Sequence, residues 1–198
     1  GSICRAGCFG GNVNGMAEIY RGVKFEVVRL PIEKIEESGI EELIRAGRAL
    51  AAKGFCPENS GNLSRRRFDF KHPSSDKDFV ITRAGSFLGE LTLRDFVIVK
   101  DVDLETKKVF VAGEAEPSSE AMMHFMIYES RKDVSVILHA HALDLKNAVV
   151  TKKAYPYGTI EFARTAVEAL RGHDLVVLKD HGFVSAGQTV SDALSGVL

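Results

Sequence analysis

The sequence is poor in cysteine, in net charge and in long apolar runs, and each shortage excludes a class of protein. Its 198 residues include three cysteines, an odd and sparse number that forms no disulfide framework and suits a reducing cytoplasm. No apolar run approaches about 18 residues, so no membrane span is predicted. The formal net charge is −1, which gives no electrostatic reason to expect nucleic-acid binding. The N-terminus lacks a charged region followed by an apolar core, so no secretory signal peptide is predicted.

What is present is the composition of an ordinary globular domain. Hydrophobic residues make up 45% of the chain and charged residues 27%, which suffices for one full core. Residues 1–22 are rich in glycine and show little periodicity. We therefore predict an N-terminal arm or extension over residues 1–35 and a single domain over residues 36–198.

Apolar periodicity predicts strands joined by short turns, with helices between them. The predicted strands lie at 25–30, 78–82, 96–99, 109–112, 134–138 and 175–178, and the predicted helices at 39–53, 117–129 and 159–170. In the second helix, a serine cap followed by an acidic residue in the first turn is the start signal. The short turns favour an antiparallel or mixed sheet covered by helices over a doubly wound parallel sheet.

The sharpest chemical feature is the pair His139 and His141 at the end of the predicted strand 134–138. Alternate residues of a strand point to the same face, so the two imidazoles can converge on one metal ion. His181 follows another apolar strand and supplies a third ring. Three histidines at strand ends, together with an acid, are typical of a catalytic zinc site with one position open for substrate. The alternative is that these are ordinary histidines on half-buried strands.

Glu120 is the candidate acid, at the start of the helix predicted over 117–129. Its alternative role is simple interaction with the positive end of the helix dipole. His124 lies one turn further along the same helix face. A packed core histidine is favoured there over a ligand or a partner of Glu120.

Small polar residues in three segments suit an anion. Ser118 and Ser119 place two hydroxyls at a helix N-terminus, where backbone N–H groups are free to donate. Asn62 lies in a polar segment around a glycine, and Gly85 lies in a turn after the strand at 78–82. Glycine allows the backbone to approach a phosphate closely. Ordinary helix capping and polar turns are the alternatives.

Five short motifs taken together resemble the class II aldolase/adducin family, and the fuculose-1-phosphate aldolases within it. They stand in the family's order: Ser60-Gly61-Asn62-Leu63-Ser64, Ile81-Thr82-Arg83-Ala84-Gly85, Glu116-Pro117-Ser118-Ser119-Glu120, His139-Ala140-His141 and Asp180-His181-Gly182. No single motif is decisive, but five in the right order are specific. The resemblance runs from about residue 40 to about residue 190.

The resemblance implies an α/β fold of three layers, with helices on both sides of a largely antiparallel central sheet. It implies a divalent metal, usually zinc, with manganese or cobalt as alternatives. The implied ligands are Glu120, His139, His141 and His181, and Glu120 also serves as acid and base. The ion acts as a Lewis acid on the oxygens of a ketose phosphate.

The same resemblance implies that Asn62, Gly85, Ser118 and Ser119 hold the phosphate of a small sugar-phosphate substrate. It implies a cytoplasmic homotetramer with sites between subunits. Neither nucleic acid nor membrane is an expected partner.

Three departures from the aldolases stand out. Ala84 replaces the threonine before the glycine turn, which removes one hydroxyl from the phosphate site. Only 39 residues separate the second and third histidines, where the aldolases carry a longer segment with a catalytic tyrosine. Tyr155 and Tyr157 lie there without a clear match, so either the loop is short or a stretch is missing. The chain ends at Leu198 soon after a predicted helix start, so the family's C-terminal helix is expected to be truncated or absent.

The preferred functional prediction is a zinc-dependent class II aldolase, a carbon–carbon lyase. It would cleave a fuculose-1-phosphate-like ketose to dihydroxyacetone phosphate and an aldehyde. The alternatives are a methylthioribulose-1-phosphate dehydratase and a pentulose-phosphate 4-epimerase. The epimerases typically carry aspartate at the position of Glu120. A non-catalytic adducin-like assembly domain ranks last, because such a module has no need of an acid and three histidines.

Overall fold

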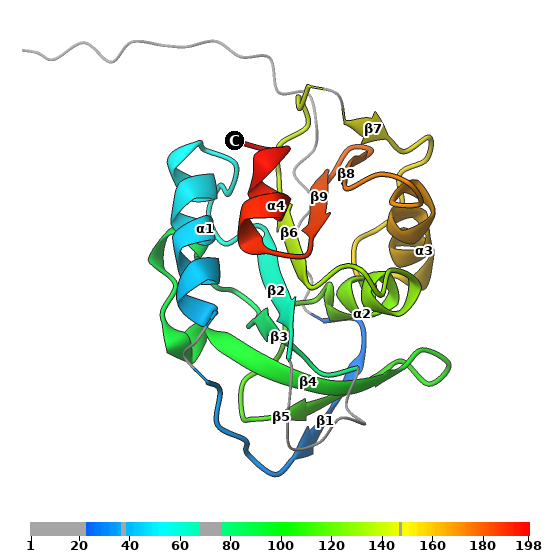
Figure 1. Ribbon diagram of the computed structural model, residues 1–198. Coiled ribbons are helices and arrows are strands. Elements are labelled where there is room, and N and C mark those ends of the chain that lie inside the picture. The colour runs from blue at the N-terminus through cyan, green and yellow to red at the C-terminus, as the bar shows by residue number, and fades with distance from the viewer. Residues whose placement is uncertain (1–22, 37–38, 68–76, 147) are drawn as a thin grey trace, which may run out of the picture.

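The computed structural model describes residues 23–36, 39–67, 77–146 and 148–198 (Figure 1). Within these residues nine strands form one sheet in the order β1-β5-β4-β3-β2-β6-β9-β8-β7. The strands are β1 Glu26–Leu30, β2 Asn62–Arg66, β3 Phe79–Thr82, β4 Phe96–Asp103, β5 Lys108–Ala112, β6 Val136–Ala140, β7 Val149–Val150, β8 Leu175–Leu178 and β9 Gly182–Gly187. The α-helices are α1 Ile40–Ala52, α2 Ala121–Ser130, α3 Ile160–Ala169 and α4 Val190–Ser195.

The sheet is antiparallel except at its two ends, where β1 pairs with β5 and β7 pairs with β8 in parallel. At its centre β2 lies beside β6, with Asn62 opposite His139. On the other side of β6, His139 is opposite Val184 of β9. The prediction of a largely antiparallel sheet is confirmed, and the central strands carry residues from three of the five motifs.

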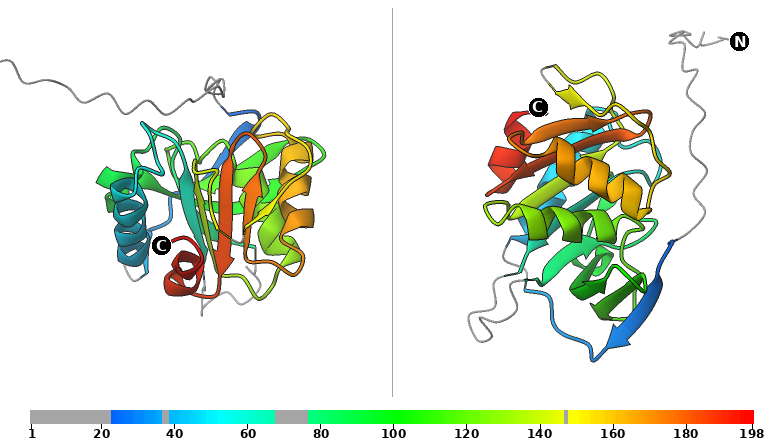
Figure 2. Two further views of the ribbon diagram at one scale, coloured as in Figure 1. Left: turned by 90° about the horizontal axis from the view of Figure 1, so that it is seen from above. Right: turned by 90° about the vertical axis from the view of Figure 1, so that its right-hand side faces the viewer.

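Helices cover both faces of the sheet, so the predicted three layers are confirmed (Figure 2). On one face α1 and α4 bury apolar side chains such as Leu43 and Ala193 in one core cluster. On the other face α2 and α3 bury a second cluster that includes Ile127 and Phe162. Two covered faces explain why every residue of the central strands β3 and β6 is buried.

The strands β7 and β9 are not among the predicted ones. Two further differences from the sequence prediction bear directly on the site. The segment around Asn62, expected as a polar turn, continues directly into β2. The second helix begins at Ala121, so Glu120 occupies its N-cap and no serine does. Ser118 donates its backbone N–H to Thr82 in a contact of 3.0 Å, which holds the segment before Glu120 against β3 and delays the helix.

The predicted arm over residues 1–35 contains β1, which forms one edge of the sheet through its pairing with β5. Residues 1–22, including Cys4 and Cys8, lie outside the described residues. The boundary at residue 35 stays a prediction. Among the residues that the structure describes, none of the helices has the length and apolar character needed to traverse a bilayer.

Candidate metal centre

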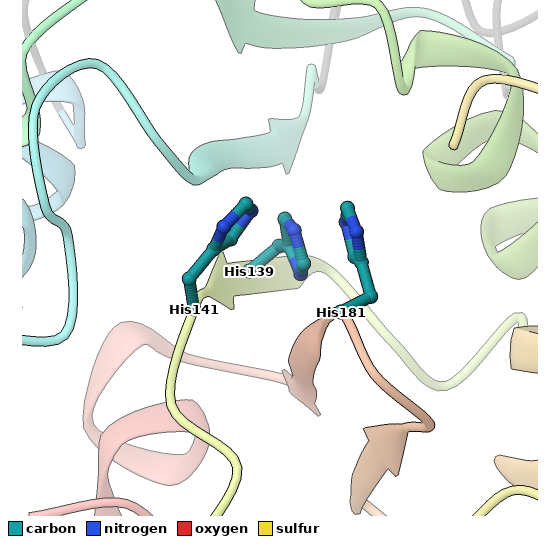
Figure 3. A group of neighbouring side chains, drawn as sticks. All are labelled: His139, His141 and His181. Atoms are coloured by element: carbon teal, nitrogen blue, oxygen red, sulfur yellow. The ribbon is translucent and has the colours of Figure 1, made fainter. Parts of the chain in front are cut away.

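Three histidines from two neighbouring parts of the sheet come together at one place (Figure 3). His139 lies in β6, His141 directly follows that strand, and His181 lies in the turn between β8 and β9. One nitrogen from each ring can be chosen so that all three lie within 4.8 Å of one another. His139 is buried, whereas the other two rings are partly exposed, which leaves the cluster open on one side.

A close approach of two backbones brings His181 to the cluster. Gly182 begins β9, and a Cβ atom there would lie 2.4 Å from the carbonyl oxygen of Ala140 and 3.0 Å from Cα of His141. A side chain at this position is therefore excluded. Asp180 adopts φ +61° in the preceding tight turn, a conformation that aspartate tolerates better than most residues. The Asp-His-Gly motif is thus explained by backbone geometry on both sides of the histidine.

Glu120 reaches the same cluster from the start of α2. Its Oε1 lies 2.9 Å from Nε2 of His181, and its Oε2 lies 3.1 Å from Nε2 of His139. Asn62 donates from Nδ2 to Oε2 at 2.6 Å. The carboxylate is 3% exposed, so it is buried among these polar groups. The four residues predicted as metal ligands are therefore neighbours, although they come from three separate segments.

The hydrogen-bond chemistry of His139 fits a cation between it and Glu120. Nδ1 of His139 lies 2.7 Å from the carbonyl oxygen of Phe183, which can only accept, so Nδ1 carries the proton. In the neutral ring Nε2 then carries a lone pair and can only accept a hydrogen bond or bind a cation. It faces the Glu120 carboxylate, a second acceptor, and has no hydrogen-bond partner among the residues that the structure describes. A metal ion bound by both groups would satisfy this buried pair, and a ligating histidine usually donates its other ring N–H to a carbonyl or carboxylate, as Nδ1 does here to Phe183.

The protonation states of the cluster also suit a metal. Burial opposes ionisation of Glu120, but His139, His181 and the Asn62 amide outweigh it and hold its pKa well below the ordinary value. Burial lowers the pKa of His139. An ionised carboxylate beside a neutral imidazole is the form that binds divalent cations.

A ladder of polar contacts continues from Glu120 between β2 and α2. Alternate residues of β2 face every fourth residue of α2, since two strand residues rise about 6.6 Å and four helical residues about 6 Å. The facing pairs are Asn62 with Glu120, Ser64 with His124, and Arg66 with Tyr128.

His124 is the central member of this ladder and is fully buried. Its Nδ1 lies 2.6 Å from Oγ of Ser64, which also contacts the Tyr128 hydroxyl at 2.7 Å. The expected packed core histidine is therefore what the structure contains, and its ring braces the strand next to Asn62.

Three of the four residues predicted to hold phosphate, Asn62, Ser118 and Ser119, are neighbours of Glu120 in space or in sequence. Ser118 and Ser119 are both buried just before α2. The 3.0 Å contact of Ser118 with Thr82 joins this segment to β3, whose following turn contains Gly85 at φ +76°. Asn62 contacts Glu120 as described, and Ser118 and Ser119 directly precede Glu120 in the chain. Gly85 is linked to this group through β3 and stays a prediction as a phosphate residue.

The site is also bordered by side chains that the spacing of the motifs does not identify. The ring of Tyr157 stacks on that of His181 with centroids 6.5 Å apart and an interplanar angle of 19°. Phe162 meets the same imidazole edge-on at 4.8 Å. Near the turn that contains Gly85, the Asn59 amide nitrogen lies 4.0 Å from the position that a Cβ atom on Gly85 would take. Tyr157 precedes α3 and Phe162 lies in its first turn, where an apolar residue looks like ordinary core in the sequence.

Comparison with known proteins adds independent findings. The family described as Class II Aldolase and Adducin N-terminal domain matches residues 41–148. L-fuculose phosphate aldolase of Methanococcus maripaludis strain S2 is 28% identical over 174 residues, which covers 78% of this chain and 87% of the relative.

A methylthioribulose-1-phosphate dehydratase of Gluconacetobacter diazotrophicus is 35% identical over 104 residues, covering 52% of this chain and 45% of that protein. Among solved structures, an L-fuculose 1-phosphate aldolase has a TM-score of 0.64 at 27% identity, over 80% of this chain and 79% of that one. The fold is therefore shared over most of the chain, whereas the dehydratase match spans less than half of the dehydratase.

Proposed function

Because the chain belongs to the class II aldolase and adducin N-terminal domain family, we propose that it is a metal-dependent lyase acting on a phosphorylated ketose. The reaction is aldol cleavage of a fuculose-1-phosphate-like sugar to dihydroxyacetone phosphate and an aldehyde. The observation that carries this proposal is the Glu120 carboxylate facing an unpartnered nitrogen of His139, with His181 at 2.9 Å. Relatives matched over most of their length bear the aldolase name.

The proposed metal ligands are Glu120, His139, His141 and His181, and zinc is the preferred ion, with manganese or cobalt as alternatives. Three imidazoles and a carboxylate are ligands that zinc accepts. A divalent ion at this position would supply Lewis acidity to the substrate's carbonyl and hydroxyl oxygens. The partly exposed side of the cluster leaves room for those oxygens.

Cleavage requires two proton movements. The C4 hydroxyl loses its proton as the C3–C4 bond breaks and the aldehyde forms, and C3 gains a proton to give dihydroxyacetone phosphate. Glu120 is the proposed base and acid: its ionised carboxylate, held in place by Asn62, would first take up the proton that the C4 hydroxyl loses and then deliver it to C3. The Tyr157 ring, stacked on His181, forms an aromatic wall of the site.

The proposed phosphate site consists of Asn62, Gly85, Ser118 and Ser119. Backbone N–H groups at a helix start, serine hydroxyls and a glycine turn together suit a dianion better than a neutral sugar end. Asn62, Ser118 and Ser119 adjoin Glu120, so a substrate whose C1 phosphate is bound there would have its reacting carbons near the carboxylate. Phosphate binding thus fixes the orientation of the reacting bond.

Dehydration of methylthioribulose-1-phosphate is the second candidate reaction, because a named dehydratase shares 35% identity with this chain. It would use the same metal and phosphate sites. The epimerase alternative is weaker, since Glu120 stands where aspartate is typical. An assembly role without catalysis does not account for four metal-binding groups arranged around one point.

The deciding experiment is a product assay on purified protein loaded separately with zinc, cobalt or manganese. Fuculose-1-phosphate, ribulose-5-phosphate and methylthioribulose-1-phosphate would be offered, and dihydroxyacetone phosphate measured with a coupled reductase. We expect that product only from the first substrate. Dehydrated product from methylthioribulose-1-phosphate would establish the second candidate, and metal-loaded protein inactive on the whole panel would refute both.

We further propose that the protein is a cytoplasmic homotetramer. Exposed apolar side chains at the β7 end of the sheet support association, with Leu143 54% and Val150 56% exposed in the single chain. Light scattering after gel filtration would give the mass; a monomer would contradict the proposal.

A further inference from the structure

A segment outside the family match reaches the candidate site. The family match begins at residue 41, whereas β1 and the residues just before it are placed by pairing with β5. Phe25 is buried in the core beneath α2 and α3. This anchor fixes the neighbouring residue, Lys24, next to the segment that leads into α3.

Lys24 borders both halves of the site. Its Nζ donates to the carbonyl oxygen of Tyr157 and lies 4.0 Å from the centroid of that ring, which in turn stacks on His181. A Cβ atom on Gly158 would lie 3.5 Å from Cδ of Lys24 and 3.0 Å from the carbonyl oxygen of Ser119. Gly158 therefore lies between the stem of Lys24 and the backbone carbonyl of Ser119, one of the proposed phosphate residues.

The charge of Lys24 is not neutralised by any carboxylate in the described ranges. Its contacts there are a carbonyl and an aromatic face, both neutral. Lys100, another half-buried lysine, contacts two carboxylates, those of Glu33 and Asp78. A partly buried ammonium group without a counter-charge is unfavourable alone and favours an anion nearby.

We propose that Lys24 binds the phosphate group of the substrate together with Ser118 and Ser119, an inference that rests on the proposed function of this site. On binding, the ammonium group leaves the Tyr157 carbonyl and donates to phosphate oxygens. A lysine suits this exchange because its charge sits on a flexible stem with three donors.

The test measures binding of inorganic phosphate by calorimetry to the purified protein and to three variants. Lys24→Gln keeps a donor for the Tyr157 carbonyl but removes the charge, and Lys24→Arg keeps the charge. Lys34→Gln is the matched control, since Lys34 is exposed. We expect the phosphate Kd to rise about tenfold in Lys24→Gln, as for loss of one charge-assisted hydrogen bond, and to stay within about twofold in the other two.

Unchanged phosphate affinity in Lys24→Gln would overturn the proposal and leave Lys24 as a clamp on Tyr157. So would an equal loss in Lys24→Arg, because charge would then not be the cause, or undetectable phosphate binding by the unmodified protein. Failure of the proposed reaction is seen separately. If phosphate binding depends on the Lys24 charge but no dihydroxyacetone phosphate forms, the lysine assignment stands and the lyase proposal falls.

Discussion

Replacing His124 by glutamine should remove much of the acid sensitivity of this fold. His124 is fully buried between β2 and α2, and in the described part of the chain its Nε2 has no hydrogen-bond partner. Burial lowers its pKa from 6.5 to about 3. The ring therefore stays neutral in the folded protein at pH values where it is protonated in the unfolded chain.

The sign follows from proton binding. Between these two pKa values the unfolded state binds more protons, so stability is complete above the unfolded pKa and is lost as the pH falls toward the folded one. Each pKa unit corresponds to about 1.4 kcal/mol. At about pH 4.5, two units below the unfolded value, His124 alone should reduce the free energy of unfolding by about 2.5 kcal/mol relative to about pH 7.

Urea unfolding at these two pH values, with a chelator present, measures the effect in wild type, His124→Gln and His173→Gln. Glutamine can still contact Ser64 but does not titrate. We expect the pH-dependent loss to shrink by about 2.5 kcal/mol only in His124→Gln, because His173 is exposed. An identical loss in wild type and His124→Gln would refute the argument that His124 is buried in its neutral form.

Three further predictions concern the site. His139→Ala should lose most bound metal while keeping its circular dichroism spectrum, with His173→Ala as the control; full metal content by elemental analysis would contradict the ligand assignment. Glu120→Gln should lower kcat by about 10²–10⁴-fold while three histidines retain the ion, and turnover within a few-fold of wild type would limit Glu120 to a ligand or cap. Replacing Ser118 and Ser119 together by alanine should raise KM for the phosphorylated sugar and leave trace activity on the free sugar nearly unchanged. Equal wild-type activity on both sugar forms would point to a different substrate class.

Elements with a strong apolar pattern could be predicted from the sequence. The helix expected at 39–53 is α1, Ile40–Ala52, because its apolar residues recur at helical spacing and bury one face. The strand expected at 78–82 is β3, whose four residues are all buried. Local periodicity suffices here because each element buries apolar side chains of its own.

The strand β2 could not be predicted in this way. Its residues Asn62, Ser64 and Arg66 face α2 and are matched there by polar partners rather than by apolar ones. The apolar alternation that marks a half-buried strand is therefore missing. The helix predicted from residue 117 begins only at Ala121 for a related reason. The backbone of Ser118 bonds to Thr82, which is distant in the sequence, and local sequence patterns do not reveal such a contact.

By itself, the sequence determined the apolar elements, the candidate ligand types and, through five ordered motifs, the family. Only the tertiary structure decided that Nε2 of His139 faces the Glu120 carboxylate without a hydrogen bond, and that Lys24 lies against Tyr157. Motif spacing records which residues are present along the chain. The direction of a lone pair and the neighbours of a charge depend on contacts between segments distant in sequence, which form only when the sheet and its helices close around them.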